Sequence, residues 1–392
     1  MGYEKSKKKI VFLTTIPDTL ANFYLPLAEK LSEEYEVMLA SSFGEATQII
    51  ENKNLRFEAF ALRRKIFWPG NFISIFKMAK WMRKEKVDMV VMSTPVAALV
   101  GRLAAFFSKV PIRVVDVRGL FPKETHRRQY ILNNITERIL NKITKWYNFI
   151  NKEDMKEYEE KGFLNGKGRA LIPCGGAGIN LSKFSPRNVD KMKVSRIKKE
   201  IGIKDSDFIV LFAGRLCEDK GIYDFIEIVK MLLDEGVVVK GIIAGGVLKG
   251  ERKPVFPNAI SKKAKELGVS ENIVYIGLRN DMPEIFHISD ILLLPSKREG
   301  FGMVFAEAAA MGIPVVAYDN RGSRTAVRDK LTGYIVPQGD KAAMVKAIKK
   351  LYSSREEMVE MGDMARAIAE EEYSSEKVIN KYIKNYEVLL RR

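Results

Sequence analysis

The chain has 392 residues, of which 46% are hydrophobic, and a formal net charge of +17 from 66 Lys and Arg against 49 Asp and Glu. This length favours two domains or three, and the hydrophobic fraction supplies a core for each, which excludes disorder of the whole chain. Two cysteines and two histidines argue against a disulfide framework and a histidine-based zinc site, and they favour a reducing compartment.

Short apolar runs alternate with amphipathic segments in the first half of the chain. Strands are predicted over residues 10–14, 36–40, 89–92 and 113–117, with helices over residues 20–33, 71–84 and 97–109. Strands that are apolar throughout and alternate with helices indicate a parallel sheet that is covered on both faces.

A second series of strands begins after an irregular stretch at residues 182–186. Its strands are predicted over residues 207–213, 237–244, 273–276, 291–294 and 315–318. We therefore expect two Rossmann-like domains, residues 1–182 and 183–375, and a helix over 376–392 that crosses back to the first. No apolar run reaches 18 residues, so no transmembrane helix is expected.

The loop after the strand at 291–294 is the richest candidate site, because ligands of open α/β sheets bind beyond the carboxyl ends of the strands. Gly300 and Gly302 permit a close approach of backbone to ligand, and the following helix offers free amides to an anion. Glu299 and Glu307 are suited to bind the hydroxyl groups of a sugar. Alternatively, Glu307 is a solvated helix residue.

Two further loops end at the same predicted edge. The loop at 214–221 places Arg215 and Lys220 beside a helix N-terminus, which suits a diphosphate, although two ordinary surface cations would give the same pattern. The loop that begins at Gly245 lacks the Lys-Ser/Thr of a P-loop and is a weaker ligand candidate.

The positive charge is concentrated in one quarter of the chain. Residues 51–150 hold 20 Lys and Arg against 7 Asp and Glu, so 20 − 7 = +13 of the +17 lies there. This excess predicts an anionic partner. Arg63, Arg64 and Trp68 form a basic aromatic loop suited to a membrane or a phosphate, and His126 lies in a second basic loop. The stripe of Phe72, Ile75, Phe76, Ala79 and Met82 is expected to pack against the sheet.

Taken together, these motifs resemble glycosyltransferase family 4 over nearly the whole chain. The resemblance is carried by Glu299 and Glu307 behind Pro295-Ser296, by Gly214-Arg215-Leu216 with Lys220-Gly221, and by residues 178–184 and 277–281. It implies a retaining, sugar-nucleotide-dependent enzyme of GT-B fold, with two Rossmann-like domains facing across a cleft. Residues 22–27, 93–103, 117–120 and 150–154 resemble the capsule, O-antigen and lipid-linked glycan members.

The resemblance also implies a role for each candidate residue. Arg215 and Lys220 would hold the donor diphosphate, Glu307 the ribose and Glu299 the donor sugar. The remaining donor contacts would come from Gly300, Phe301, Gly302, Leu278, Arg279 and Gly245. Arg118 stands where many members have a His near the reacting centre, and Asn22 lies in a loop that lacks the double glycine of many members. No metal or other cofactor is required.

We therefore expect a cytoplasmic hexosyl- or N-acetylhexosaminyltransferase on the inner face of the cell membrane. Its partners would be a UDP-sugar, a lipid-diphosphate-linked or cell-surface glycan acceptor and an anionic membrane surface, with no nucleic acid. One alternative is a sugar-nucleotide epimerase of GT-B fold, which the poverty in histidine opposes. Another is a basic nucleic-acid-binding protein, for which no helix-turn-helix, RRM or zinc pattern is present.

Overall fold

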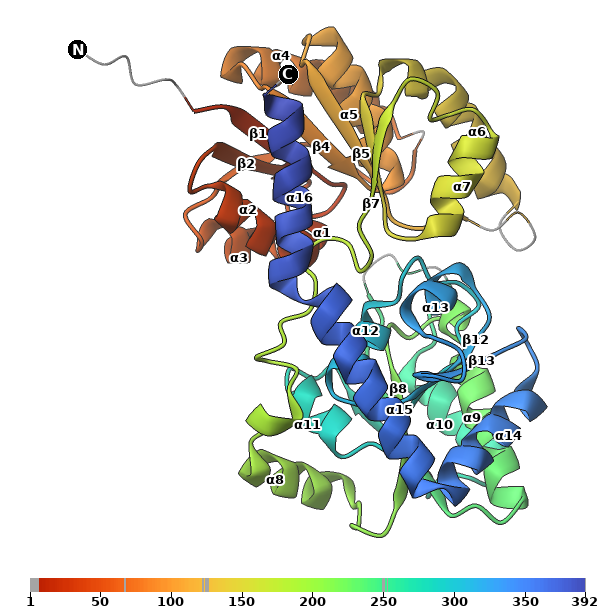
Figure 1. Ribbon diagram of the computed structural model, residues 1–392. Coiled ribbons are helices and arrows are strands. Elements are labelled where there is room, and N and C mark those ends of the chain that lie inside the picture. Colours follow the sequence, from red (N-terminus) through yellow and green to blue (C-terminus); the bar gives the residue numbers. More distant parts are fainter. Residues whose placement is uncertain are drawn as a thin grey trace. The chain divides into compact units, whose positions relative to one another are not determined.

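The computed structural model describes residues 7–66, 68–121, 123, 127–248, 251 and 253–391. The chain forms two compact units (Figure 1). Unit 1 comprises Met1–Gly178 with Ser375–Arg392, and unit 2 comprises Ile179–Ser374. The sequence predicts the divisions after residues 182 and 375, and the structure has them after Gly178 and Ser374.

Unit 1 is built on a seven-stranded parallel sheet with the strand order β3-β2-β1-β4-β5-β6-β7. The strands are β1 (Lys9–Leu13), β2 (Glu36–Ser41), β3 (Arg56–Ala59), β4 (Met89–Ser93), β5 (Ile112–Val117), β6 (Trp146–Phe149) and β7 (Gly168–Leu171). The central strands β1 and β4 are buried along almost their whole length, because helices cover both faces of the sheet.

The helices of unit 1 divide between the two faces of this sheet. They are α1 (Pro17–Phe23), α2 (Leu25–Leu31), α3 (Thr47–Glu51), α4 (Pro69–Glu85), α5 (Pro95–Phe107), α6 (Arg127–Leu140), α7 (Lys152–Glu160), α16 (Ser375–Leu390) and the 3-10 turn η1 (Asn141–Ile143). Successive side chains of β1 point to opposite faces. Leu13 belongs to the core cluster that includes residues of α4 and α5, whereas the ring of Phe12 lies 6.2 Å from that of Tyr386 in α16. Figure 1 shows α16 running beside β1, in agreement with this ring contact.

The prediction that an apolar stripe of α4 packs against the sheet is correct for only some of its residues. Ile75, Ala79 and Met82 are buried, but Phe72 and Phe76 are 48% and 71% exposed. The two phenylalanines lie one helical stripe further round, on the side where Arg83 donates a hydrogen bond of 2.6 Å to the last carbonyl of α5. They therefore lie beside the buried stripe of α4 and face solvent.

Unit 2 is built on a six-stranded parallel sheet with the strand order β10-β9-β8-β11-β12-β13. The strands are β8 (Phe208–Ala213), β9 (Val239–Ala244), β10 (Ile273–Gly277), β11 (Ile291–Leu294), β12 (Val315–Tyr318) and β13 (Gly333–Val336). Every residue of β8, β11 and β12 is buried, as expected for strands covered on both faces. The prediction of two parallel-sheet α/β domains is thus confirmed.

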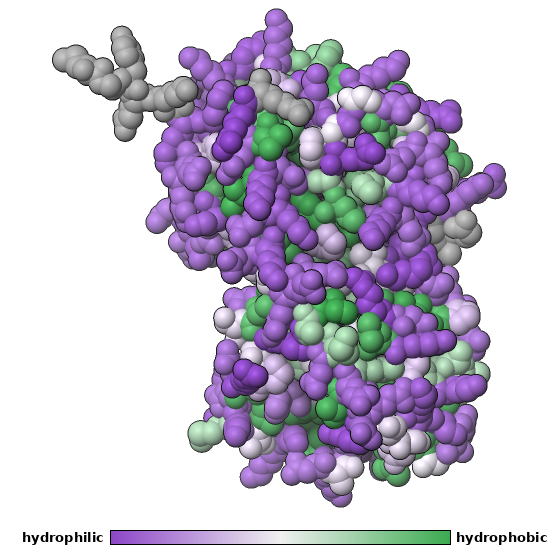
Figure 2. Space-filling view, viewed as in Figure 1, coloured by the Kyte–Doolittle hydropathy of each residue, from purple (hydrophilic) through white to green (hydrophobic). Residues whose placement is uncertain are grey.

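The helices of unit 2 connect these strands. The α-helices are α8 (Lys191–Ile201), α9 (Ile222–Asp234), α10 (Pro257–Glu266), α11 (Met282–His287), α12 (Met303–Ala310), α13 (Arg321–Ala326), α14 (Lys341–Ser353) and α15 (Arg355–Ile368). Shorter turns are η2 (Pro186–Asn188), η3 (Glu218–Lys220) and the π-helical η4 (Ala369–Tyr373). Hydrophilic side chains predominate on the face of each unit that Figure 2 shows. None of the helices in the described part of the chain combines the length and hydropathy needed to cross a bilayer.

Candidate active site

In unit 2, the loops that follow β8, β9 and β10 are joined by backbone hydrogen bonds beyond the strand ends. Gly214 donates to Ala244 over 3.0 Å, and Gly245 donates to Gly277 over 2.8 Å. A Cβ on Gly245 would lie only 1.8 Å from the carbonyl oxygen of Gly214. A glycine is therefore needed at position 245 for the close packing of these loops. This packing role explains why a glycine stands at the sheet edge, where the resemblance predicts a donor contact.

The loop after β8 also packs against the loop after β11. Gly221 adopts φ +76°, and a Cβ there would lie 1.9 Å from the carbonyl oxygen of Pro295. The amide of Lys297 donates to the carbonyl of Asp219 over 2.8 Å. Only glycine combines this backbone conformation with so close an approach. The two loops with the predicted cations and carboxylates are therefore held together at one sheet edge.

Lys220 and Glu299 come together across these loops. The ammonium of Lys220 donates to Oε1 of Glu299, and both side chains are largely buried. A Cβ on Gly322, at the start of α13, would lie 2.4 Å from the Cβ of Glu299, so this glycine gives the carboxylate room. A buried cation beside a buried carboxylate offers a ligand one donor group and one acceptor group at neighbouring positions.

Arg215 forms a second ion pair, with Glu251. The arginine is half-buried and the side chain of Glu251 is largely buried. Sequence reasoning did not single out Glu251, because no motif surrounds it in the loop after β9. Its place in that loop, at the same sheet edge, was the available signal.

Glu307 lies in the second turn of α12, the helix that begins just after Gly302. Burial raises the pKa of its carboxyl group to about 7, although the charge of Lys183 opposes the rise. Phe301 is buried, and its ring packs edge-on against Tyr373 at 5.2 Å. The side chain of Phe301 is therefore part of the core, which leaves its backbone for the predicted donor contact.

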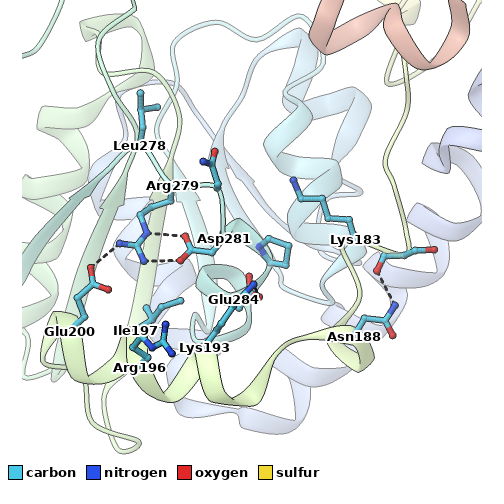
Figure 3. Close-up of a pocket in the computed structure, with 13 residues that line it drawn as sticks. Lys183, Asn188, Lys193, Arg196, Ile197, Glu200, Leu278, Arg279, Asp281 and Glu284 are labelled. Atoms are coloured by element: carbon cyan, nitrogen blue, oxygen red, sulfur yellow. Dashed lines mark hydrogen bonds and ion pairs between the residues drawn. The ribbon is translucent and has the colours of Figure 1, made fainter. Parts of the chain in front are cut away.

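A pocket of about 770 Å³ lies next to the residues predicted to edge the nucleobase. Figure 3 shows Arg279 between two carboxylates, and it donates to Asp281 over 2.9 and 2.8 Å and to Glu200 over 2.8 Å. These hydrogen bonds raise the pKa of Arg279. Leu278 is 74% exposed beside it, and Lys183 lines the same pocket. Lys183, whose charge opposes the rise in the pKa of Glu307, therefore also lines this pocket.

In unit 1, Arg118 lies just beyond the carboxyl end of β5. Its guanidinium stacks on the rings of Phe23 and Tyr24 at 4.4 and 4.8 Å, and its Nε donates to the Tyr24 hydroxyl over 3.3 Å. That hydroxyl donates in turn to Asp116 over 2.6 Å. Burial alone would lower the pKa of Arg118, but nearby Tyr24, Tyr382 and Asp116 outweigh it and raise the pKa. The Nη2 group is buried with no hydrogen-bond partner among the described residues.

The other predicted acceptor and membrane residues lie on the surface of unit 1. Asn22 is exposed near the end of α1. The guanidinium of Arg63 stacks on the ring of Trp68 at 4.5 Å, and Arg64 is exposed beside it. His126 lies outside the described residues. In the part of the chain that the structure describes, no cluster of three or more His, Cys, Asp and Glu side chains is arranged to hold a metal ion.

Comparison with known proteins identifies the fold and its class. Residues 193–368 match the model of the glycosyl transferases group 1, and residues 9–149 match the glycosyl transferase 4-like model. A solved structure of Anabaena HepE in complex with UDP superposes with a TM-score of 0.80 at 18% identity, covering 97% of this chain and 100% of that chain. The protein is therefore a glycosyltransferase of GT-B fold. It belongs to glycosyltransferase family 4, as the sequence motifs predict.

Three curated relatives of the chain are glycosyltransferases. The capsular polysaccharide biosynthesis glycosyltransferase CapM of Staphylococcus aureus is 25% identical over 98% of both chains. The UDP-Gal:alpha-D-GlcNAc-diphosphoundecaprenol alpha-1,3-galactosyltransferase of Escherichia coli is 24% identical over 82% of this chain and 81% of its own. The N,N'-diacetylbacillosaminyl-diphospho-undecaprenol alpha-1,3-N-acetylgalactosaminyltransferase of Campylobacter jejuni is 25% identical over 98% and 99%. The epimerase and nucleic-acid alternatives are not favoured.

Proposed function

We propose that this protein is a retaining glycosyltransferase that moves a hexosyl or N-acetylhexosaminyl group from a UDP-sugar to a lipid-diphosphate-linked or cell-surface glycan. The observation that carries the proposal is the buried ion pair of Lys220 and Glu299, where the loops after β8 and β11 meet. UDP as the donor nucleotide is supported by the UDP bound to HepE and by the UDP-Gal named for the Escherichia coli relative.

In the proposed reaction, the bond between the anomeric carbon and the diphosphate oxygen breaks. A bond to the acceptor hydroxyl oxygen forms on the same face of the sugar, and the hydroxyl proton is released. Negative charge develops on the departing UDP, and Lys220 and Arg215 would neutralise it. A single positioned donor of this kind contributes about 100-fold or more to the rate of comparable reactions.

The carboxylates would bind the donor through its hydroxyl groups. Glu307 would accept hydrogen bonds from the ribose, and Glu299 would accept them from the transferred sugar while Lys220 contacts the diphosphate. Leu278 and Arg279 would contact the base at the mouth of the pocket in Figure 3. We also propose that the two cations do the work of a divalent metal, so a chelator should leave transfer unchanged.

The acceptor side belongs to unit 1. We propose that Arg118, with its buried Nη2 group, contacts the reacting end of the donor or the acceptor diphosphate, and that Asn22 borders the acceptor. Lipid-diphosphate acceptors are named for the Escherichia coli and Campylobacter relatives. We also propose that the protein associates peripherally with the inner face of the cell membrane, and that Arg63, Arg64 and Trp68 contribute to this association.

Thermal unfolding with UDP-, GDP- and ADP-sugars tests the donor assignment, because only a bound nucleotide sugar stabilises the fold. We expect UDP-sugars alone to raise the melting temperature, and an equal response to GDP- or ADP-sugars would refute that choice. The Lys220→Met and Glu299→Gln variants should each lose transfer about 100-fold to a lipid-diphosphate glycan. The matched control is Lys262→Met on the surface of α10. Near-full transfer by either folded site variant would overturn the proposed roles.

A further inference from the structure

Helix α6 of unit 1 exposes an apolar stripe and buries a charged side chain, which is unusual for a helix that packs on a sheet. Its outer side carries Ile131, Ile135 and Ile139, which are 46%, 51% and 64% exposed and lie one helical turn apart from one another. On its inner side, Glu137 and Leu140 are buried and Asn133 and Asn134 are half-buried. An amphipathic helix normally buries its apolar stripe and exposes its charges. The exposed stripe on α6 is therefore available to a partner outside the chain.

A buried ion pair holds α6 in this orientation. Arg102 of α5 donates to the two carboxylate oxygens of Glu137 over 2.9 and 2.7 Å, and both side chains are almost fully buried. The hydroxyl of Tyr147 in β6 donates to the same carboxylate over 2.9 Å. Turning the isoleucines inward would break these bonds and leave charges buried without partners. The outward stripe is thus fixed by the fold.

The outer side of α6 is also basic. Arg128 and Arg138 lie along the isoleucine stripe of α6, Lys142 follows in the turn η1, and all three are exposed. None of them forms an ion pair with a residue in the described ranges. Glu137 is the only acidic residue in the sequence from 127 to 142, and it points inward to Arg102. The exposed side of the helix therefore combines apolar side chains with unneutralised cations.

A basic pocket of about 330 Å³ adjoins the C-terminal end of α6. Four cationic side chains line it: Arg138, Lys142, Lys161 and Lys167. Lys161 pairs with Glu157, whereas burial and the nearby cations Lys145 and Arg113 lower the pKa of Lys167. A small pocket with an excess of ammonium and guanidinium groups suits a phosphate group.

We propose that the outer side of α6 docks on an anionic phospholipid bilayer, with the three isoleucines in the interface and a lipid headgroup phosphate in the adjoining pocket. This inference rests on the proposed function, and it names the surface by which the enzyme reaches a membrane-bound acceptor. A second copy of the chain fits less well, because a symmetric pairing of two α6 stripes would bring their cations together. An anionic bilayer instead neutralises those cations while it buries the isoleucines.

Flotation of the full chain with lipid vesicles tests this surface. We expect wild-type protein to bind phosphatidylcholine vesicles that contain phosphatidylglycerol and to bind pure phosphatidylcholine much more weakly. Combined replacement I131N/I135N/I139N should weaken binding about 100-fold, because the apolar contribution is lost. Combined replacement R128Q/R138Q/K142Q should weaken binding to the anionic vesicles about fivefold for each charge. An Ile135→Trp variant should show a blue-shifted emission that acyl-chain-brominated lipids quench.

The matched control is Ile49→Asn, since Ile49 is a 53% exposed isoleucine of α3 in the same unit. It should leave vesicle binding unchanged. Transfer to a short-chain, water-soluble acceptor should stay normal in all α6 variants, which separates a docking defect from misfolding or lost catalysis. If wild-type protein transfers sugar but ignores anionic vesicles, the docking proposal fails while the proposed transfer reaction stands. If the isoleucine variant only converts an oligomer to a monomer in sedimentation, the surface binds a second copy and the lipid proposal is wrong.

Discussion

Replacing Glu307 with glutamine tests the carboxylate of α12 through both stability and binding. Burial raises the pKa of Glu307 from its ordinary 4.5 to about 7, with partial opposition from Lys183. The unfolded chain ionises this group near 4.5, whereas the folded protein keeps the proton until about 7. That difference corresponds to at most about 3 kcal/mol. Because Glu307 is half-buried and water screens part of the effect, we expect about 2 kcal/mol.

The sign of the effect follows from which state ionises first. Below pH 4.5 the Glu307 carboxyl is protonated in both states and contributes no difference. As the pH rises from 4.5 to about 7, only the unfolded state ionises, so this group lowers the free energy of unfolding. Above about 7 the full penalty applies. Glutamine carries no charge, so the Glu307→Gln variant should be more stable than wild type at pH 8 by about 2 kcal/mol and equally stable near pH 4.5.

Urea unfolding across this pH range measures the stability difference, and calorimetric titration with a UDP-sugar measures the function. The ionised carboxylate is the better acceptor for ribose hydroxyls, so wild-type affinity should rise with pH through about 7. The Glu307→Gln variant should bind about tenfold more weakly at high pH, with a flat pH profile. Glu360→Gln, at an exposed position of α15, is the control. A variant that gains no stability at high pH, or that binds UDP-sugar as wild type does, would refute the reasoning.

Three further substitutions test the packing around the candidate residues. Gly221→Ala places a Cβ against the neighbouring loop, so urea unfolding should show a larger loss than for Gly236→Ala, which has a similar φ of +80° but nothing within 4 Å. Arg102→Met leaves the carboxylate of Glu137 buried and alone, so the free energy of unfolding should fall by about 3–5 kcal/mol, and E137L added to it should restore much of this. Tyr382→Phe removes a hydroxyl group near Arg118 and should lower kcat by about tenfold with the KM for UDP-sugar unchanged, as expected if Tyr382 positions this arginine. An equal change in kcat and KM would contradict that positioning role.

The sequence predicts the central strands well because burial on both faces leaves a simple signal. The strand predicted over residues 291–294 coincides with β11, and the one over 207–213 contains β8. The outer strands β3, β6, β7 and β13 were missed. Their residues are partly polar, as with Arg56 and Asn148, and β3 and β7 lie at the two sheet edges, where a continuous apolar run is not needed.

The site was predictable only as a set of loops. The rule that ligands bind beyond the carboxyl ends of parallel strands pointed to Lys220 and Glu299 separately. Their ion pair joins residues that are 79 positions apart in the sequence. No periodic pattern in the sequence indicates a contact across so long a separation. The same limit applies to Glu251, which Arg215 contacts, and to α6. Isoleucines spaced one turn apart predict a buried stripe, and only the inward pair of Arg102 and Glu137 reverses that reading.

Helix α16 contributes to the environment of Arg118 as well as to the core of unit 1. The hydroxyl of Tyr382 accepts a hydrogen bond of 3.1 Å from the amide of Gly176, and a Cβ on that glycine would lie 2.5 Å from the carbonyl oxygen of Phe23. The ring of Phe23 in turn supports the guanidinium of Arg118. The C-terminal segment thus fixes the loop that ends unit 1 against the end of α1, next to the predicted catalytic arginine. A chain that ended at Ser374 would lose this support. The support of the loop is therefore a physical reason for the return of residues 375–392 to unit 1.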